Sequence, residues 1–294
     1  MNDSVPGNSL LRTQPYSLSN VEAIKYPVLI SVPHSGRDYP AALLDNLKVP
    51  ASHLVRLEDR YADRLAASAI ACGFPSIIAQ KPRAWIDLNR SHREIDPDML
   101  AGVDSAQTHH MSKKVRGGLG ILPRRLHGVG DLWREKWHHQ QIVERISQDH
   151  EPYHQAVADL LASIEAVFGC ALLLDLHSMP SVFDENAQKI GFVVGDRFGR
   201  SCGPQYAELT AAHFRKHGHL VQTNHPYSGG YMLERHGKPA RNIHAFQLEV
   251  DRALYLDNEM REPIPASRAI AELIRDCCLM LAEEMSGRQL EAAE

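Results

Sequence analysis

Apolar residues along the chain fall into short strand-like runs that are separated by stretches with helical spacing. Residues 26–34 (YPVLISVPH) alternate in polarity and are rich in β-branched residues, which predicts a strand ending at His34. Further strands are expected at 74–80, 84–88, 170–177, 190–195, 219–223 and 244–250. Helical periodicity predicts helices over much of 53–72, over 131–167 with a break near Pro152, over 203–217 and over about 265–286.

Strands that alternate with helices predict an α/β fold. We expect a single domain, with a mostly parallel central sheet and helices on both faces. Residues 1–24 are polar and rich in Ser, Asn and Pro, so they are expected to form a loosely ordered arm before a catalytic domain at 25–290. Residues 91–130 form a long connection rich in Gly, His and Arg, and a connection of that length within a compact domain is usually functional.

Composition narrows the class of protein. The 294 residues are 44% hydrophobic with a net charge of −4, which is ordinary for a soluble globular protein and gives no reason to expect nucleic acid as a partner. No apolar run approaches the ~18–20 residues of a membrane helix, and the N-terminus does not resemble a secretory signal. The five cysteines lack C-x-x-C spacing, which favours reduced thiols in the cytoplasm. We therefore expect a cytoplasmic protein that acts on a small molecule.

Residues whose side chains can catalyse reactions or bind ligands lie at or near the ends of several predicted strands. The carboxyl ends of strands in a parallel sheet meet at one edge, where ligands bind. A carboxylate within a buried strand is costly unless it has a partner. The residues concerned are His34, Asp87, Asn89, Arg90, His177 and Glu249.

This set suits a metal-dependent hydrolase. A catalytic zinc ion takes three ligands from His and Asp/Glu, and it lowers the pKa of a bound water. His34 and His177 are expected to supply two ligands, and the segment RLEDRYADRL offers a third. The carboxylates of that segment are Glu58, Asp59 and Asp63. Candidates for holding an anionic substrate are Arg83, Arg90 and Arg116.

Seven motifs, taken in order, resemble the N-formylglutamate amidohydrolase family. They are VPHSGRDYP, RLEDRYADRL, IDLNR, GLGILPR, LLLDLHSMP, GGYMLERHG and NIHAFQLEV, and they extend from about residue 26 to residue 256. The resemblance implies a zinc-carboxypeptidase-like fold, also related to the aspartoacylases. It further implies a zinc enzyme that hydrolyses an N-acyl amino acid, in the first place N-formyl-L-glutamate to L-glutamate and formate, a reaction of histidine degradation.

The resemblance also implies roles for individual residues. His34 and His177 would bind zinc, Glu249 would act as general base and acid, and Arg83 would assist catalysis. Asn89 and Arg90 would face the substrate.

The resemblance identifies the third zinc ligand less directly. Zinc carboxypeptidases use an H-x-x-E motif, but here Arg37 occupies the position three residues after His34. We expect Asp59, with Glu58 second and Asp38 third. If 53–65 is one continuous helix, however, Asp59 lies nearly opposite Leu57 and Tyr61.

Other interpretations stay open. Ser35 or Ser178 would serve a serine hydrolase, although no G-x-S-x-G motif is present. A cysteine nucleophile fares no better, because Cys170 lies at the start of a predicted buried strand. A metal-free binding protein on the same fold is a further alternative. The same chemistry also suits other N-acyl amino acids or a small carboxypeptidase-type substrate. Glycines at 117–120 and in 228–231 are expected to shape the pocket, and a second substrate carboxylate would be bound by one of Arg116, Arg124, Tyr227 and Arg241.

Overall fold

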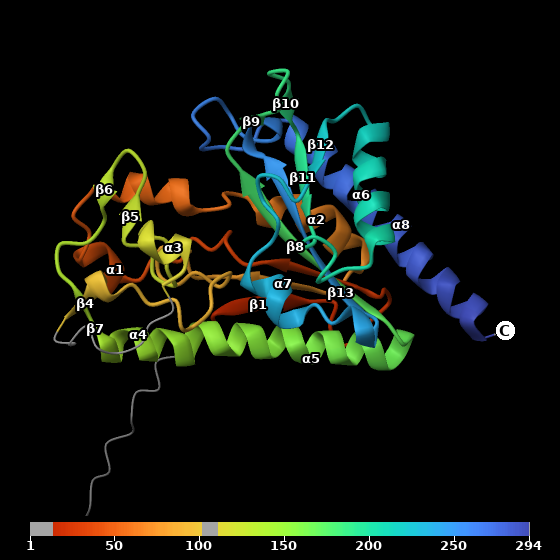
Figure 1. The fold of residues 1–294 in the computed structure, drawn as a ribbon, viewed down its shortest axis with the longest axis horizontal. Coiled ribbons are helices and arrows are strands. Elements are labelled where there is room, and N and C mark those ends of the chain that lie inside the picture. The colour runs from red at the N-terminus through yellow and green to blue at the C-terminus, as the bar shows by residue number, and fades with distance from the viewer. Residues whose placement is uncertain (1–13, 102–110, 294) are drawn as a thin grey trace, which may run out of the picture.

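A mixed sheet forms the centre of the computed structural model, which describes residues 14–101 and 111–293 (Figure 1). Within these residues the sheet has the strand order β1-β3-β2-β8-β13-β11-β12. Four of its six neighbouring pairs are parallel, and the pairs β1–β3 and β11–β13 are antiparallel. The strands are β1 (Tyr16–Ser19), β2 (Val28–Val32), β3 (Ser76–Ala79), β8 (Ala171–Met179), β11 (Phe192–Gly195), β12 (Val221–Thr223) and β13 (Ile243–Asp251).

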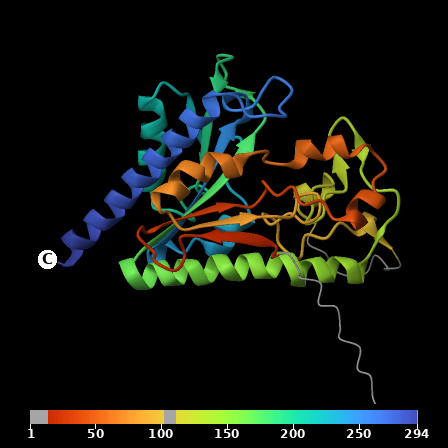
Figure 2. The ribbon, with the colours of Figure 1, turned by 180° about the vertical axis from the view of Figure 1, so that it is seen from behind.

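Helices cover both faces of this sheet, as the two opposite views show (Figures 1 and 2). One face packs against α2 (Ala62–Cys72), α6 (Pro204–Lys216) and α8 (Ala266–Ala293). The other face packs against α5 (Glu151–Phe168) and the short α7 (Tyr231–His236). The predicted single-domain α/β fold, with a mostly parallel sheet between helices, is therefore confirmed.

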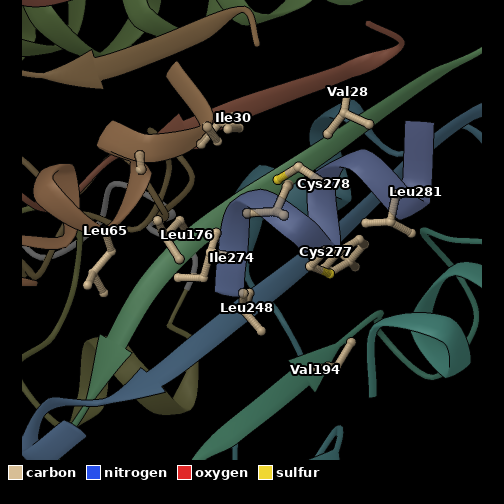
Figure 3. Packing of buried hydrophobic residues seen from close by; sticks show 14 of the residues in the cluster. Val28, Ile30, Leu65, Leu176, Val194, Leu248, Ile274, Cys277, Cys278 and Leu281 are labelled. Atoms are coloured by element: carbon tan, nitrogen blue, oxygen red, sulfur yellow. The ribbon is translucent and has the colours of Figure 1, made fainter. Parts of the chain in front are cut away.

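The central strands β8 and β13 are buried along their whole nine-residue lengths. On the α8 side, Leu176 and Leu248 pack beneath Ile274 and Cys277 (Figure 3). Side chains alternate between the two faces of a strand, so the residues between these leucines point to the opposite side. The opposite face begins with apolar residues such as Leu173 and Ala245 and becomes polar toward the carboxyl ends of the strands.

A smaller lobe lies beyond the carboxyl ends of β2 and β8 and is built from short elements (Figure 1). It contains much of the predicted 91–130 connection, of which residues 102–110 lie outside the described residues. Its elements are α1 (Ala41–Asp45), the 3-10 helices Ala51–Leu57 and Pro97–Met99, β4 (Leu100–Ala101), α3 (Lys113–Arg116), β5 (Arg125–Leu126), β6 (Gly130–Asp131) and β7 (Trp137–His138). A small hairpin, β9 (Val182–Phe183) with β10 (Lys189–Ile190), lies beside β11 and β12 (Figure 1).

Three predicted elements differ from the structure. Residues 84–88 are not a strand; they form tight turns in which Asp87 N–H donates to the Ile121 carbonyl at 2.7 Å. The region 131–167 becomes helical only at α4 (His139–Arg145). Near Pro152 the helix does not break. A π-helical turn at Ile146–His150 joins α4 to α5, because a wider turn accommodates the hydrogen bond that proline cannot donate.

The third difference concerns 53–72, which is two helices rather than one. The 3-10 helix ends at Leu57, Glu58 is extended, and α2 begins only at Ala62. Tyr61, just before α2, has a left-handed backbone with φ of 59°. The expectation of a continuous helix is therefore wrong, and the break frees Asp59 from a helical face.

Part of the predicted N-terminal arm belongs to the sheet. Residues 1–13 lie outside the described residues, but Tyr16–Ser19 forms β1 and pairs with β3 from Tyr16↔Ala79 to Ser19↔Ser76. These residues are held by strand pairing rather than loosely, since an edge strand satisfies half of its backbone groups through its neighbour. Among the described helices, none combines the length and apolar character needed to cross a membrane.

Candidate active site

The parallel register of β8 and β13 creates the floor of the candidate site. Asp175 pairs with Gln247, and His177 pairs with Glu249 two residues further along. Since residues two apart share a face, these four side chains form one polar patch where the apolar α5 side of the sheet ends. All four are buried.

The break before α2 brings Asp59 to this patch. Its backbone N–H donates to the His34 carbonyl at 2.9 Å, which ties the break to the end of β2. Carboxylate oxygen Oδ1 accepts hydrogen bonds from the Ser178 hydroxyl at 3.2 Å and from the Arg252 guanidinium at 3.3 Å. The other oxygen, Oδ2, faces the two histidines.

His34, Asp59 and His177 meet at a single point. Asp59 Oδ2 lies 2.8 Å from His177 Nδ1 and 3.4 Å from His34 Nδ1. One ligand atom from each of the three residues lies within 4.8 Å of the others. His34 Nδ1 is buried and makes no hydrogen bond within the described residues. Two imidazole nitrogens and a carboxylate oxygen are a suitable ligand set for catalytic zinc, so these residues can hold such an ion.

Two further carboxylates hold the outer nitrogen of each imidazole. His34 Nε2 lies 2.8 Å from Asp87, and His177 Nε2 lies 2.7 Å from Asp175. Asp175 also accepts a 2.8 Å hydrogen bond from the Ser31 hydroxyl. Carboxylates in this position fix the tautomer of a metal-binding histidine, with Nε2 donating and Nδ1 left to bind. Both histidines therefore present the same nitrogen to the centre.

The electrostatics of the cluster also favour a cation. Burial disfavours a charged carboxyl, yet contacts with His177 and His34 hold the pKa of Asp59 well below its ordinary value. Burial likewise opposes charge on His177, but Asp175 and Asp59 together raise its pKa well above the ordinary value. A metal ion that binds these groups must displace the proton from Nδ1, so the site is built to stabilise positive charge.

Glu249 lies beside this cluster, and its pKa is shifted in the opposite direction to that of Asp59. Burial raises its pKa to about 7. The side-chain amide of Gln247 donates to its Oε1 and holds the carboxyl in position. A carboxyl with a pKa near the working pH can both accept and return a proton, as a general base and acid does.

A cavity of about 510 Å³ opens above these residues. His34, Asp59, His177 and Glu249 line its floor, and residues of the smaller lobe and of the 226–230 loop line its walls. Arg83 donates through Nε to Asp87 at 2.8 Å. Arg90 donates to the carbonyls of Leu119 and Asn89 at 3.0 and 2.7 Å. Both guanidinium groups are thereby held at the cavity wall.

The sequence profile of the N-formylglutamate amidohydrolase family matches residues 26–256, most of the chain. The chain belongs to this family. N-formylglutamate deformylase of Pseudomonas aeruginosa is 29% identical over 275 residues, covering 89% of this chain and 93% of that protein. The protein of the same name from Pseudomonas putida is 29% identical over 262 residues, covering 84% and 88%. A crystal structure of N-formylglutamate amidohydrolase from Ralstonia eutropha matches with a TM-score of 0.85 at 28% identity, covering 93% of this chain and 99% of that chain.

The structure brings most of the family-based candidates together. His34, Asp59, His177, Arg83, Asn89, Arg90, Tyr227 and Glu249 all line the cavity. Asn89 is held on both sides, since its Oδ1 accepts from Met232 N–H at 3.0 Å and its Nδ2 lies 3.4 Å from Gln247. Gly230 permits this arrangement, because a Cβ there would lie 2.3 Å from Asn89 Oδ1.

Other candidates lie elsewhere. Arg116 is exposed at the end of α3 and does not line the cavity, although its neighbours Lys114 and Gly117 do. The remaining carboxylates of the alternatives are engaged: Glu58 with Tyr39 and Arg60, Asp38 with Lys81, and Asp63 with Arg37. Arg124 pairs with Asp96 and Arg241 with Glu165.

The nucleophiles of the rival hydrolases are poorly placed. The Ser178 hydroxyl accepts from Arg252 and donates to the carboxylate of Asp59, whose pKa lies well below its ordinary value, so its partner is too weak a base to remove its proton. Ser35 is buried and its hydroxyl has no hydrogen-bond partner within the described residues. Cys170 is buried, and burial raises the pKa of its thiol. Within the described residues, none of the three is hydrogen-bonded to a histidine or another base strong enough to activate a nucleophile.

Several residues of the site received no specific role from the sequence, although Asp87 is among the strand-end candidates. Asp87 and Asp175 hold the histidines, Gln247 holds Glu249, and Arg252 holds Asp59. Asp175 and Gln247 also carried a signal, since each lies two residues before a candidate on the same strand. Lys114 and Arg252 carried no such signal, because only the folded chain brings them to the cavity.

A buried histidine cluster supports the substrate-facing segment from behind. His154 Nε2 donates to the Leu88 carbonyl at 2.9 Å, and His150 Nε2 donates to the Arg90 carbonyl at 2.8 Å. His154 Nδ1 lies 2.9 Å from His236 Nε2. Burial lowers the pKa of His150 to about 4 and that of His236 to about 3. These histidines are therefore neutral in the folded protein at neutral pH.

The cluster predicts loss of stability in mild acid. His150 in the unfolded chain has an ordinary pKa of about 6.5, whereas its pKa in the folded protein is about 4. Between these values the unfolded chain binds a proton that the folded protein does not, so acid favours unfolding. The free energy of unfolding should therefore fall by about 2 kcal/mol from pH 7 to 5 on account of His150 alone. Urea unfolding with chelator present measures this. H150Q should remove that part of the pH dependence, while H217Q, at an exposed position, should not; an unchanged pH dependence in H150Q would contradict the account.

Proposed function

We propose that this protein hydrolyses N-formyl-L-glutamate to L-glutamate and formate. The observation that carries this proposal is the convergence of His34, Asp59 and His177 beside the buried carboxyl of Glu249. Family membership and the named activity of the two Pseudomonas relatives support the choice of substrate. Arginines on the cavity wall suit a substrate that carries carboxylates.

We propose zinc as the metal, held by Nδ1 of His34, Nδ1 of His177 and Oδ2 of Asp59. When bound, zinc lowers the pKa of a water molecule and polarises the carbonyl of the scissile amide. Asp87 and Asp175 keep the two imidazoles in the tautomer that leaves Nδ1 available. Arg252 and Ser178 keep the Asp59 carboxylate turned toward the histidines.

The protein's own residues supply the proton transfers and the binding of the substrate. Glu249 takes a proton from the attacking water and then gives a proton to the departing amide nitrogen, so the C–N bond breaks with a neutral amine as the leaving group. Arg83 stabilises the negative charge that develops on the formyl oxygen. Arg90 and Asn89 fix the α-carboxylate, and Tyr227 closes one wall. A guanidinium group matches a carboxylate in geometry, which orients the amide.

Product analysis tests this function. Purified protein with one equivalent of zinc should release formate and L-glutamate in equal amounts from N-formyl-L-glutamate. N-acetyl-L-glutamate, which differs by one methyl group on the reacting carbonyl, should be a poorer substrate by about 10-fold or more. Release of acetate with no release of formate would replace the deformylase by a deacylase, and release of neither would refute the function.

A further inference from the structure

We propose that Lys114 binds the side-chain carboxylate of the substrate and thereby selects a dicarboxylic N-acyl amino acid. The inference rests on the proposed function and deepens it, since it assigns a residue to the second carboxylate. It starts from an imbalance of charge in the cavity. Seven basic side chains line the walls, and the acidic residues of the lining are Asp59 and Glu249, both at the reacting centre. The basic residues are Arg56, Arg83, Arg90, Lys114, Arg125, His127 and Arg252.

The five arginines of the lining already have hydrogen-bond partners. Arg252 pairs with Asp59, and Arg83 and Arg90 pair with Asp87. At the mouth, Arg125 pairs with Asp131 at 3.1 Å, and Arg56 donates to the His127 carbonyl at 3.1 Å. Lys114 is different: within residues 14–101 and 111–293 its ammonium group forms neither an ion pair nor a hydrogen bond. Among the lysine and arginine side chains that line the cavity, and within the described residues, it is the one without a hydrogen-bond partner and so is free to accept an anion.

The neighbours of Lys114 make that anion favourable. Burial, together with the positive charges of Arg90 and Arg83, lowers the pKa of the Lys114 ammonium, so its charge is held at a cost. Asp87 and Glu249 act in the other direction but do not cancel this effect. Lys114 is exposed at the cavity wall, and like charges gathered there are stabilised when an anion enters. A substrate carboxylate supplies that anion.

The backbone around Lys114 is held in place before any ligand enters. Ser112 caps α3 by accepting from Val115 N–H at 3.2 Å, and its hydroxyl donates to Glu94. Leu119 N–H returns to the Lys114 carbonyl at 2.8 Å. Val115 is fully buried beneath the lobe. The lysine therefore extends from a fixed turn, which suits a residue that determines specificity.

Lys114 stands on the smaller lobe, and the reacting groups stand on the sheet. A substrate that bridges the two would place its amide at Glu249 and its α-carboxylate at Arg90. The side chain would then lead toward α3. The neutral analogue N-formyl-L-glutamine has the same shape but lacks the second charge, so it isolates the contribution of Lys114.

The test compares N-formyl-L-glutamate with N-formyl-L-glutamine in wild type, K114M and the matched control K113M. Lys113 and Lys114 are both exposed on α3, but only Lys114 lines the cavity. Wild type and K113M should prefer the glutamate substrate. K114M should lose about 10- to 100-fold in kcat/KM on that substrate, mainly through KM, because a contact between charged groups is lost. Its loss on the glutamine substrate should be much smaller.

The outcomes separate this inference from the proposed function. If wild type releases formate and K114M keeps the same preference for glutamate, Lys114 is not the selecting residue and the function stands. If wild type hydrolyses neither compound, the function fails, and calorimetric binding of glutarate against butyrate then tests Lys114 alone. A preference for glutarate that is lost in K114M and kept in K113M supports the inference. An equal preference in all three proteins overturns it.

Discussion

Replacing Glu249 by glutamine should lower kcat for N-formyl-L-glutamate by about 100- to 10,000-fold while zinc stays bound. Glutamine has the same size, and its amide oxygen can still accept the hydrogen bond that Gln247 now gives to the carboxyl. It cannot take a proton from water or return one to nitrogen. KM should change little, since Glu249 is not assigned to the substrate's carboxylates. Steady-state kinetics with elemental analysis of the same sample measures both quantities.

E259Q, which changes an exposed glutamate remote from the cavity, is the matched control and should behave as wild type. Activity in E249Q within a few-fold of wild type would remove Glu249 from the proton transfers. Loss of zinc together with activity would instead mean that the carboxyl supports the metal, which the position of Glu249 outside the three-residue cluster argues against.

Replacing Asp59 by asparagine should abolish stable zinc binding. The amide oxygen can take over the contacts of Oδ1 with Ser178 and Arg252, which places the NH2 group toward Nδ1 of His34 and His177. The site then loses one ligand and one negative charge. Residues that only support a ligand alter metal affinity by about 10- to 100-fold, so loss of a direct ligand should exceed this, and formate release should fall with it.

E58Q distinguishes Asp59 from its neighbour. Glu58 is also buried but binds Tyr39 and Arg60, so E58Q should keep one zinc per chain even if its stability falls. Thermal unfolding of both variants separates stability from metal loss. If D59N retained zinc and E58Q lost it, the zinc ligand would be Glu58 rather than Asp59.

Much of the site was accessible from the sequence because strands impose simple geometry. His177 and Glu249 lie in buried nine-residue strands, where a polar residue stands out against its neighbours. Their pairing opposite each other follows from the parallel register of β8 and β13, which no sequence pattern specifies. Local patterns therefore found the residues, and only the sheet order explained why they meet.

The position of Asp59 could not be predicted from local sequence patterns. The periodicity of 53–72 suggested one helix, because Leu54, Leu57 and Leu65 recur at helical intervals. The break at 58–61 depends on tertiary contacts, among them Arg252 donating to the Glu58 carbonyl and Asp59 N–H donating to His34. Lys114 was missed for a similar reason. The role proposed for it depends on arginines that are distant in the sequence, and a pair of adjacent lysines in a polar stretch carries no local signal.

The central claim is that a metal held by His34, Asp59 and His177 serves amide hydrolysis. The most direct measurement is formate release from N-formyl-L-glutamate before chelation, after chelation, and after zinc is restored, with zinc counted per chain at each step. The account predicts about one zinc per chain, loss of activity with loss of zinc, and recovery of both together. Undiminished formate release from protein that contains no metal would contradict it.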